Sequence, residues 1–440
     1  MDIKHIKTPI LKPTPFLSRK DKITVIAAVS LGNLLEWYEI YLYVYWAPTF
    51  AKLFFHSTDN LNLIYTYLIF SIGFLARPLG GLFFGRIGDK LGRKKSMILS
   101  ILIMIVPTFI IGLLPTYAQI GVFAPIILTL MRLLQAFPAG GELPGAMCYL
   151  YESAEPHKRK FMSSWGACGF QLGILVSTIE CFILERSLSP QSLLQWGWRL
   201  SFLLGGLIGF LGLYLRHKLH ETPLFKDITS HGQVVKKNLL QVLYKYKKAI
   251  FTGVLFCTLN SASFYWLSIN VSMSFEAIFG TSYEHNLILT CILLLFITIP
   301  LPFFGMLADH YSVKKMLIYS TIGTIILIYP LHMSIHHASL KGMVISIALF
   351  CLLFTCISAL IPYILCDLFP TYVRFTCTAF SFNLVDALIG GFTPTIALCL
   401  LRFTGNQNSF CWFLLLCALI SLIAYCQIPA KKDFIHNPPT

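Results

Sequence analysis

The feature that most constrains this chain is a series of long apolar runs, most of them close to the length of a membrane-spanning helix. A helix needs about 20 apolar residues to cross a bilayer. Over its 440 residues the chain is 56% hydrophobic and only 12% charged, whereas soluble domains carry about 25% charged residues. A soluble core could not bury this much apolar surface. The runs are continuous rather than ten-residue alternations, so they predict helices in lipid and not the strands of a barrel.

Twelve such runs divide the chain into predicted transmembrane helices. Their approximate ranges are 23–55, 62–85, 96–115, 120–150, 161–184, 199–216, 249–278, 286–308, 316–333, 342–366, 373–399 and 409–427. A long polar stretch separates the first six runs from the last six. We therefore predict an all-α, polytopic membrane protein with two pseudo-symmetric six-helix bundles. Its expected parts are an N-terminal segment 1–22, a first bundle 23–216, a linker 217–248, a second bundle 249–427 and a tail 428–440.

Positive charge is concentrated in alternate loops. With the N-terminus assigned to the cytoplasm, 27 of the 34 Lys and Arg fall in cytoplasmic segments and 5 in outer segments. The other two, Arg77 and Arg132, lie within predicted spans. Cytoplasmic loops of membrane proteins carry such an excess, so both termini are expected in the cytoplasm, and the first run is expected to stay as a span in the cell (inner) membrane. The net charge of +15 is then a topogenic signal facing the lipid bilayer, and no nucleic-acid partner is expected.

Two compositional features do not indicate a metal or a cofactor. The 13 cysteines lie mostly inside apolar runs, without the spacing of metal ligands. His332, His336 and His337 have metal-like spacing, but their predicted outer loop offers no cysteine or carboxylate partner. The sequence has no Walker motif and no paired catalytic constellation, which predicts a non-enzyme driven by an ion gradient.

One highly charged stretch occurs twice. "GRIGDKLGRKK", which begins at Gly85, holds six formal charges, and "GMLADHYSVKK" begins 220 residues later at Gly305. The two copies align Asp89 with Asp309 and follow the second span of each half. Internal repeats of this kind are typical of secondary transporters, whose binding site lies at the midplane between the repeats.

The first copy resembles the G-x-x-x-D-[RK]-x-G-R-[RK]-[RK] signature of the major facilitator superfamily. Other stretches resemble its metabolite–proton symporter branch, which includes proline/betaine, α-ketoglutarate, citrate and shikimate carriers. They are "GNLLEWYEIYLY" (32–43), "GFLARPLGGLFFGRIGD" (73–89), "RLLQAFPAGGE" (132–142), "WGWRLSFLLGG" (196–206), "LHETPLF" (219–225) and "LFPTYVRFT" (368–376). The resemblance covers nearly the whole chain and implies alternating access with a proton as the coupling ion.

The resemblance also implies that the repeated stretch is an inner gate. Asp89 would cap the N-terminus of a neighbouring helix and pair with Arg93, while glycines allow the backbones to approach. The predicted gating residues are Gly85, Asp89, Gly92, Arg93, Arg77, Asp309 and Arg374. The sequence departs from the branch where Glu39 replaces the usual Asp, where Asp386 enters the eleventh span, and where the long helical tail of osmosensing members is absent.

Acidic residues inside spans are the candidates for proton coupling, because an ionisable group in a membrane span is costly and functional by default. Glu36 lies about 20 Å along the first span, and Glu39 lies one turn further on the same face. Buried carboxylates take up protons readily, which favours a proton site. The alternative is that Glu36 or Glu39 neutralises Arg132 as a structural pair. Glu142 is a candidate for gate pairing or proton release, and Asp386 for a second proton site.

Arg132 is the candidate substrate ligand, because a guanidinium can hold a carboxylate with two hydrogen bonds. A single deep cation favours zwitterions or monocarboxylates over di- and tricarboxylates. Tyr43, Asn260 and Asn383 are further substrate candidates, although membrane asparagines also bond between helices.

We therefore expect a monomeric, proton-coupled symporter that imports a small organic solute such as proline or betaine. A di- or tricarboxylate symporter for α-ketoglutarate or citrate is the alternative within the class. A transport-inactive sensor on the same fold and an exporter also stay open, and an uptake assay under an imposed proton gradient separates them.

Overall fold

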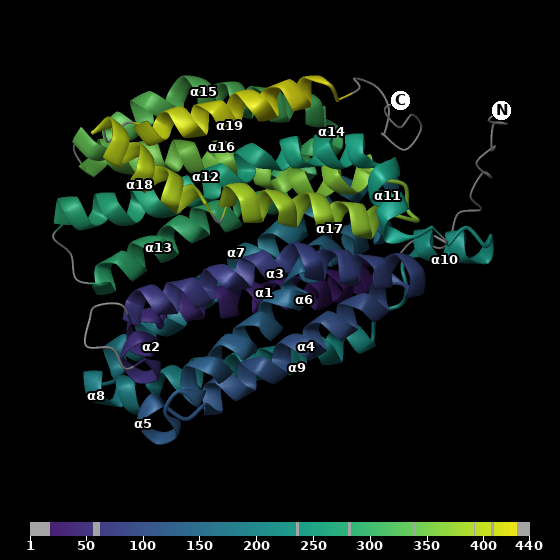
Figure 1. Ribbon diagram of the computed structural model, residues 1–440. Coiled ribbons are helices and arrows are strands. Elements are labelled where there is room, and N and C mark those ends of the chain that lie inside the picture. Colours follow the sequence, from purple (N-terminus) through teal and green to yellow (C-terminus); the bar gives the residue numbers. More distant parts are fainter. Residues whose placement is uncertain are drawn as a thin grey trace.

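The computed structural model describes residues 18–55, 62–234, 237–279, 283–337, 340–390, 392–405 and 409–428, which fold into long, roughly parallel helices without a strand (Figure 1). Twelve membrane crossings follow one another along this part of the chain. They are α1 (Arg19–Tyr45) with α2 (Ala47–Phe54), α3 (Asn62–Leu91), α4 (Arg93–Leu113), α6 (Phe123–Ser153), α7 (Arg159–Ser187), α9 (Trp198–His217), α12 (Lys247–Phe279), α13 (Tyr283–Thr298) with α14 (Pro300–His310), α15 (Val313–His337), α16 (Leu340–Leu368), α17 (Arg374–Val385) with α18 (Thr393–Thr404), and α19 (Ser409–Cys426).

Eleven crossings are long and apolar enough to span a membrane as continuous stretches of the described chain. The remaining crossing is the predicted eleventh span, in which α17 and α18 are separated by the π-helical turn η3 (Asp386–Gly390). Short elements join the others. They are α5 (Tyr117–Ile120), η1 (Pro156–Lys158), α8 (Pro190–Ser192), η2 (Leu193–Gly197), α10 (Pro223–Ser230) and α11 (Leu239–Lys245). The predicted all-α architecture is confirmed, and the predicted linker contains the helices α10 and α11.

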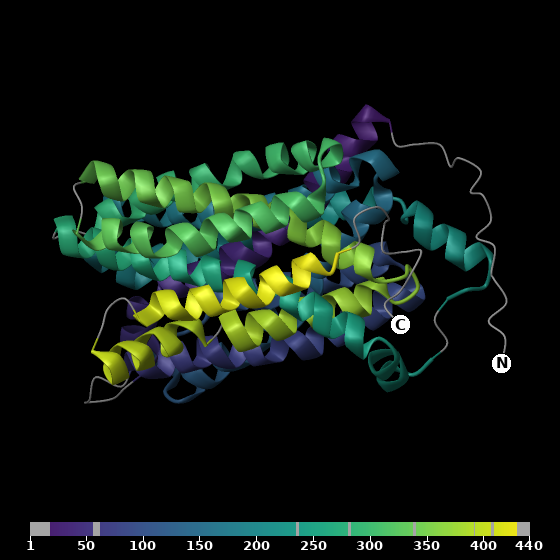
Figure 2. The same ribbon diagram turned by 90° about the horizontal axis from the view of Figure 1, so that it is seen from above.

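The helices form two bundles that lie side by side. The first bundle, α1 to α9, is the purple-to-blue half of Figure 1, and the second, α12 to α19, is the green-to-yellow half. Figures 1 and 2 show α10 and α11 at the same end of the long helices, which we call the linker end. The opposite end is called the far end.

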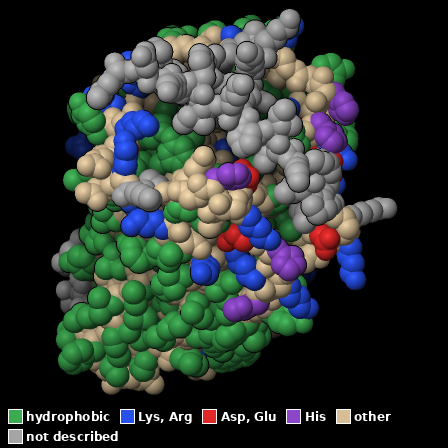
Figure 3. All heavy atoms as spheres, turned by 90° about the vertical axis from the view of Figure 1, so that its right-hand side faces the viewer, with side chains coloured by type: hydrophobic (Ala, Val, Ile, Leu, Met, Phe, Trp, Pro, Cys, Tyr) green, Lys and Arg blue, Asp and Glu red, His purple; other side chains and the backbone are tan. Residues whose placement is uncertain are grey.

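Side chains sort by chemistry as a membrane requires. Large apolar side chains such as Leu79, Leu113, Leu207 and Phe303 are exposed along the sides of the bundles, where lipid takes the place of water. Figure 3 views the linker end, where many Lys and Arg side chains gather among hydrophobic neighbours. The molecule is therefore a multi-pass membrane protein with a charged rim at its linker end.

Glycines allow close backbone contacts between helices, both within a bundle and between the two bundles. A Cβ on Gly140 of α6 would lie 1.9 Å from the carbonyl oxygen of Arg77 in α3, so α3 and α6 pack backbone to backbone. A Cβ on Gly85 of α3 would lie 2.6 Å from Cα of Thr376 in α17. The second contact joins the two bundles at the linker end, where only glycine allows it.

Candidate functional site

A buried guanidinium connects the two bundles. Arg77 in α3 donates from Nη1 to Oδ2 of Asp386 at 3.0 Å and from Nη2 to Oε1 of Glu36 in α1. Asp386 begins the turn η3 of the second bundle, and its other oxygen lies 3.4 Å from Oγ of Ser261 in α12. All three charged side chains are less than 10% exposed. The bridge therefore places two carboxylates from opposite bundles on one cation.

This arrangement corrects two sequence-based assignments. Arg77 was expected at the gate, but the gate contacts lie further along α3 near Asp89, and Arg77 instead holds the central acids. Glu36 was considered a partner for Arg132, whereas its partner is Arg77. Among the described residues, the cation that pairs with Asp386 comes from the other bundle.

Arg132 is buried without a direct ion pair in the described part of the chain. Its guanidinium lies 4.3 Å from the ring centre of Tyr43, a cation–π distance, and Nη1 donates to Gln135 at 2.9 Å. Nε2 of Gln135 donates to Oε2 of Glu39 at 3.2 Å, and the hydroxyl group of Thr108 donates to Oε1 of Glu39. Nε of Arg132 has no hydrogen-bond partner among the described residues. The cation is thus incompletely neutralised and can bind an anion.

Three neighbouring cavities connect these groups. A small cavity of about 20 Å³ is lined by Glu36, Glu39, Arg77 and Arg132. A larger one of about 310 Å³ lies between the bundles on the side of the far end. It shares Ile40, Phe70 and Phe74 with the small cavity. A volume of roughly 10–15 Å³ holds one water, so the larger cavity has room for a small organic solute.

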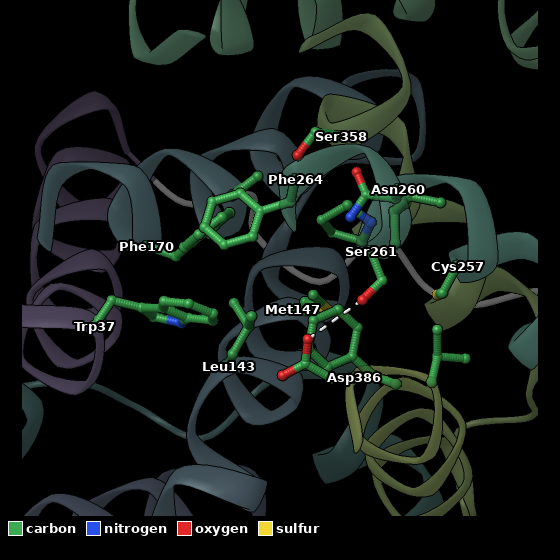
Figure 4. A pocket seen from close by; sticks show the side chains of 15 residues that line it. Trp37, Leu143, Met147, Phe170, Cys257, Asn260, Ser261, Phe264, Ser358 and Asp386 are labelled. Carbon is green, nitrogen blue, oxygen red and sulfur yellow. Dashed lines mark hydrogen bonds between the residues drawn. The ribbon is translucent and has the colours of Figure 1, made fainter. Parts of the chain in front are cut away.

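The third cavity, which we call the aromatic cavity, adjoins the larger one through Trp37 and Phe264 (Figure 4). The ring centre of Trp37 lies 4.5 Å from that of Phe170 and 5.9 Å from that of Phe264. Asp386 and Asn260 face the same space, of about 40 Å³. Nε1 of Trp37 and Oδ1 of Asn260 are buried without a partner in the described structure, so both can still form hydrogen bonds with a ligand or water.

Two other candidates lie in packed surroundings. Glu142 is fully buried, pairs with Arg216 of α9 and accepts from Ser100 at 2.6 Å. Asn383 donates to the carbonyl oxygens of Gly140 and Ala379, at 2.6 and 2.7 Å. These contacts provide helix packing, and neither residue lines the three cavities described above.

The linker end is closed by a cap that crosses between bundles. Asp89 near the end of α3 accepts from the backbone N–H groups of Phe375 and Thr376, at 3.2 and 2.9 Å, and from Oγ1 of Thr376 at 2.6 Å. These donors belong to the first turn of α17, where unpaired N–H groups favour a carboxylate. The capping role predicted for Asp89 is confirmed.

The repeated motif makes the mirror contact. Asp309 near the end of α14 accepts from the N–H groups of Lys160 and Phe161 in the first turn of α7, at 3.1 and 3.2 Å. Each bundle therefore caps a helix of the other.

A buried charge cluster lies beside the Asp89 cap. Glu152 at the end of α6 accepts from Arg93 at 2.9 and 3.0 Å and from Arg374 of α17 at 2.7 Å. Arg93 also lies 3.4 Å from Asp89, as predicted. Sequence reasoning missed Glu152, although an acid at the end of the fourth span, at the same end of the bundle as Arg93 and Arg374, was a usable signal. Removing one partner of such a buried cluster costs about 3–5 kcal/mol.

Gly92 ends α3 where a side chain does not fit. Its φ is +109°, and a Cβ there would lie 2.2 Å from Oε2 of Glu221. Glu221 of the linker accepts from the backbone N–H of Arg93 at 3.0 Å and so caps α4. The structure therefore explains Gly92 by its positive φ and by the nearby side chain of Glu221, and not by the close approach of another backbone that was predicted.

Two bundles closed at one end, with cavities between them and buried charges beside those cavities, define a secondary transporter of the alternating-access type. Residues 24–231 match the family described as "Sugar (and other) transporter". The proline/betaine transporter of Escherichia coli (strain K12) is 30% identical over 430 residues, which cover 96% of this chain and 86% of that protein. The glycine betaine/proline/ectoine/pipecolic acid transporter OusA of Dickeya dadantii (strain 3937) is 30% identical over 411 residues, covering 90% and 81%.

The fold has solved counterparts. The major facilitator superfamily proton:xylose symporter XylE bound to 6-bromo-6-deoxy-D-glucose matches with a TM-score of 0.76, at 15% identity, over 94% of this chain and 97% of that one. The chain belongs to the family of the proline/betaine transporters, and it has the fold of the major facilitator superfamily. It is a small-solute transporter and not an enzyme.

Proposed function

We propose that this protein is a proton-coupled symporter that imports a small zwitterionic solute, such as proline or betaine, through alternating access. The observation that carries the proposal is the bridge from Glu36 through Arg77 to Asp386, which links the bundles beside the aromatic cavity. The names of the relatives, which include proline, betaine and ectoine as solutes, support the same substrate class.

The two ends of a zwitterion find different surroundings. Arg132 supplies an incompletely neutralised cation for a carboxylate. The rings of Trp37, Phe170 and Phe264, with the carboxylate of Asp386 nearby, suit an ammonium group. Because the larger cavity adjoins both places, one solute can use them together. One such cation favours a single carboxylate over the two or three of a di- or tricarboxylate.

Proton coupling is proposed to act through the bridge. Glu36 and Asp386 each hold Arg77 while they are charged. Protonation of either acid removes one ion pair, which weakens the link between the bundles and frees the guanidinium. A proton that loads at the far end and leaves at the linker end thereby couples its own gradient to the change of conformation.

The protein is proposed to lie in the cell membrane as a monomer, with the linker end and both termini in the cytoplasm. The distribution of 27 against 5 positive residues supports this orientation. Both halves of the gate come from one chain, so a monomer suffices. No metal or organic cofactor enters the proposal, and the proton is the coupling ion.

Uptake into proteoliposomes tests the proposal. Vesicles holding the purified carrier, with an imposed inward proton gradient, receive radiolabelled proline, betaine, citrate or α-ketoglutarate. Accumulation of proline or betaine that a protonophore abolishes is expected. Accumulation of only citrate or α-ketoglutarate would contradict the substrate class, and accumulation that survives the protonophore would contradict the coupling ion. Binding without any uptake would instead support a transport-inactive sensor.

A further inference from the structure

Two cysteines face each other across the two bundles. Sγ of Cys148 in α6 lies 3.8 Å from Sγ of Cys366 in α16, and neither side chain is exposed. The two residues are 218 positions apart in the chain. Sulfur atoms at this distance are in van der Waals contact, and a disulfide of about 2.05 Å requires a further approach of under about 2 Å.

The cysteine pair lies next to the closed gate. Cys148 precedes Glu152 by one helical turn on α6, and the carbonyl oxygen of Cys366 accepts from Nε of Arg374 at 2.8 Å. Arg374 and Glu152 are in turn paired with each other. Any movement that separates the bundles at the linker end must therefore also separate the two sulfur atoms.

We propose that Cys148 and Cys366 form a reversible disulfide that locks the carrier closed at its linker end under oxidising conditions. The oxidant is a peroxide. It transfers one oxygen atom to the first thiol, which becomes a sulfenic acid as the peroxide is reduced to water or an alcohol. The second thiol then attacks the sulfenic sulfur, the S–S bond forms, and water leaves. A dithiol returns both cysteines to thiols and is itself oxidised to a disulfide.

The transport cycle makes both the oxidation of the first thiol and the attack of the second thiol possible. In the closed state the thiols are shielded from solvent, whereas opening at the linker end exposes them to the aqueous phase there. Reclosure brings the second thiol onto the oxidised one at the distance seen here. The bond then joins α6 to α16, so the bundles cannot separate again until it is reduced. Transport stops with the gate shut, which prevents a damaged or stressed carrier from leaking.

Cleavage of the linker gives a direct test that needs no knowledge of the solute. A protease site is inserted after Gly232, an exposed linker residue with open space around it. The full chain in proteoliposomes is treated with hydrogen peroxide, blocked with N-ethylmaleimide and cleaved, and the halves are separated on a non-reducing gel. The halves are expected to stay joined, and dithiothreitol is expected to release them.

Matched variants identify the bond. Cys148→Ser and Cys366→Ser are each expected to yield separate halves after oxidation, and Cys148→Ala repeats the test if the serine variant is unstable. Cys181→Ser is the control, since Cys181 is buried within the first bundle alone, and its halves should stay joined. Separate halves in the oxidised parent, or joined halves in Cys366→Ser, would overturn the proposal.

A transport measurement tests the lock itself. Uptake of the solute that the parent carries is expected to fall in proportion to the cross-linked fraction and to return with dithiothreitol, whereas Cys148→Ser should keep its uptake after peroxide. Full uptake by a fully cross-linked carrier would refute the lock while leaving the bond intact. Because the gel assay involves no transport, failure of the proposed substrate class leaves this inference separately testable.

Discussion

Asp89 of the first bundle and Thr376 of the second share two hydrogen bonds, from the backbone N–H and the hydroxyl group of Thr376 to one oxygen of Asp89, at 2.9 and 2.6 Å. The equivalent acid of the second bundle, Asp309, makes the reciprocal contact with the first turn of α7. The two bundles are thus joined at the linker end by a pair of crossed helix caps. Helix caps are individually worth about 0.5–2 kcal/mol, which suits a contact that must break in every transport cycle.

Asp89→Ala is expected to shift the carrier toward states open at the linker end. Loss of the cap removes about 1–2 kcal/mol from the closed state, which corresponds to a roughly 5- to 30-fold change in population, while Arg93 keeps its ion pair with Glu152. The alkylation rate of Cys148, which lies behind this gate, measures the change and should rise. Asp227→Ala, on the linker helix α10, serves as the control and should leave that rate unchanged.

Gly85→Ala is also expected to shift the carrier toward states open at the linker end, in this case through a steric clash. The new Cβ would lie 2.6 Å from Cα of Thr376, a backbone atom that cannot turn aside. The closed gate should therefore be lost, and Cys148 should become accessible. Gly166→Ala is a matched helical control, because its nearest neighbours lie at 3.8 Å and belong to side chains. Equal alkylation rates in the two variants would show that close approach at Gly85 is not required.

The fold and the helix caps at the linker end were predictable because their signals are local in the sequence: apolar runs for the membrane spans, and a repeated motif for the caps. Apolar runs gave the twelve crossings, and the two motif copies located Asp89 and Asp309. The depth of Arg77 was not predictable from the same signals. Hydropathy marks where lipid contact ends, whereas α3 continues as a helix to Leu91. Arg77 therefore lies about 21 Å from the end of its helix, deeper than the apolar run suggested.

The partners of the buried charges were also beyond a sequence-based prediction. Pairing of Arg77 with Asp386 depends on how α3 of one bundle packs against η3 of the other, 309 residues further along the chain. Pairing of Glu142 with Arg216 depends on packing between α6 and α9. A single sequence gives the position of a charge along its helix, but the packing of helices within and between the bundles decides which charges meet.

Glu36→Gln is expected to abolish accumulation of solute against its gradient while sparing exchange of internal for external solute. The amide keeps the shape of the side chain and can still bond with Arg77, but it cannot take up or release a proton. Counterflow and gradient-driven uptake, measured on the same vesicles, separate the two effects. Glu155→Gln, at a half-buried acid near the start of α7 that pairs with Lys22 and lines none of the three cavities, is the control. Intact accumulation by Glu36→Gln would assign the proton to another acid, with Asp386 the next to test.

Phe264→Leu is expected to weaken the binding of solutes that carry a quaternary ammonium more than the binding of solutes that carry a secondary amine. Phe264 packs against Trp37 and Phe170 around the aromatic cavity, with ring centres at 5.9 and 5.5 Å. Leucine keeps the apolar surface but lacks the electron-rich face that attracts a cation. Because a cation–π contact is worth about 0.5–2 kcal/mol, KM for betaine should rise roughly 2- to 30-fold. The rise for proline should be smaller, because its N–H groups can form hydrogen bonds that replace part of the loss.

Arg132→Lys supplies the contrast, since a lysine cannot form the two-pronged contact with a carboxylate and should raise KM for both solutes alike. Equal effects of Phe264→Leu on betaine and proline would remove the aromatic cavity from ammonium recognition and leave Asp386 as the remaining candidate.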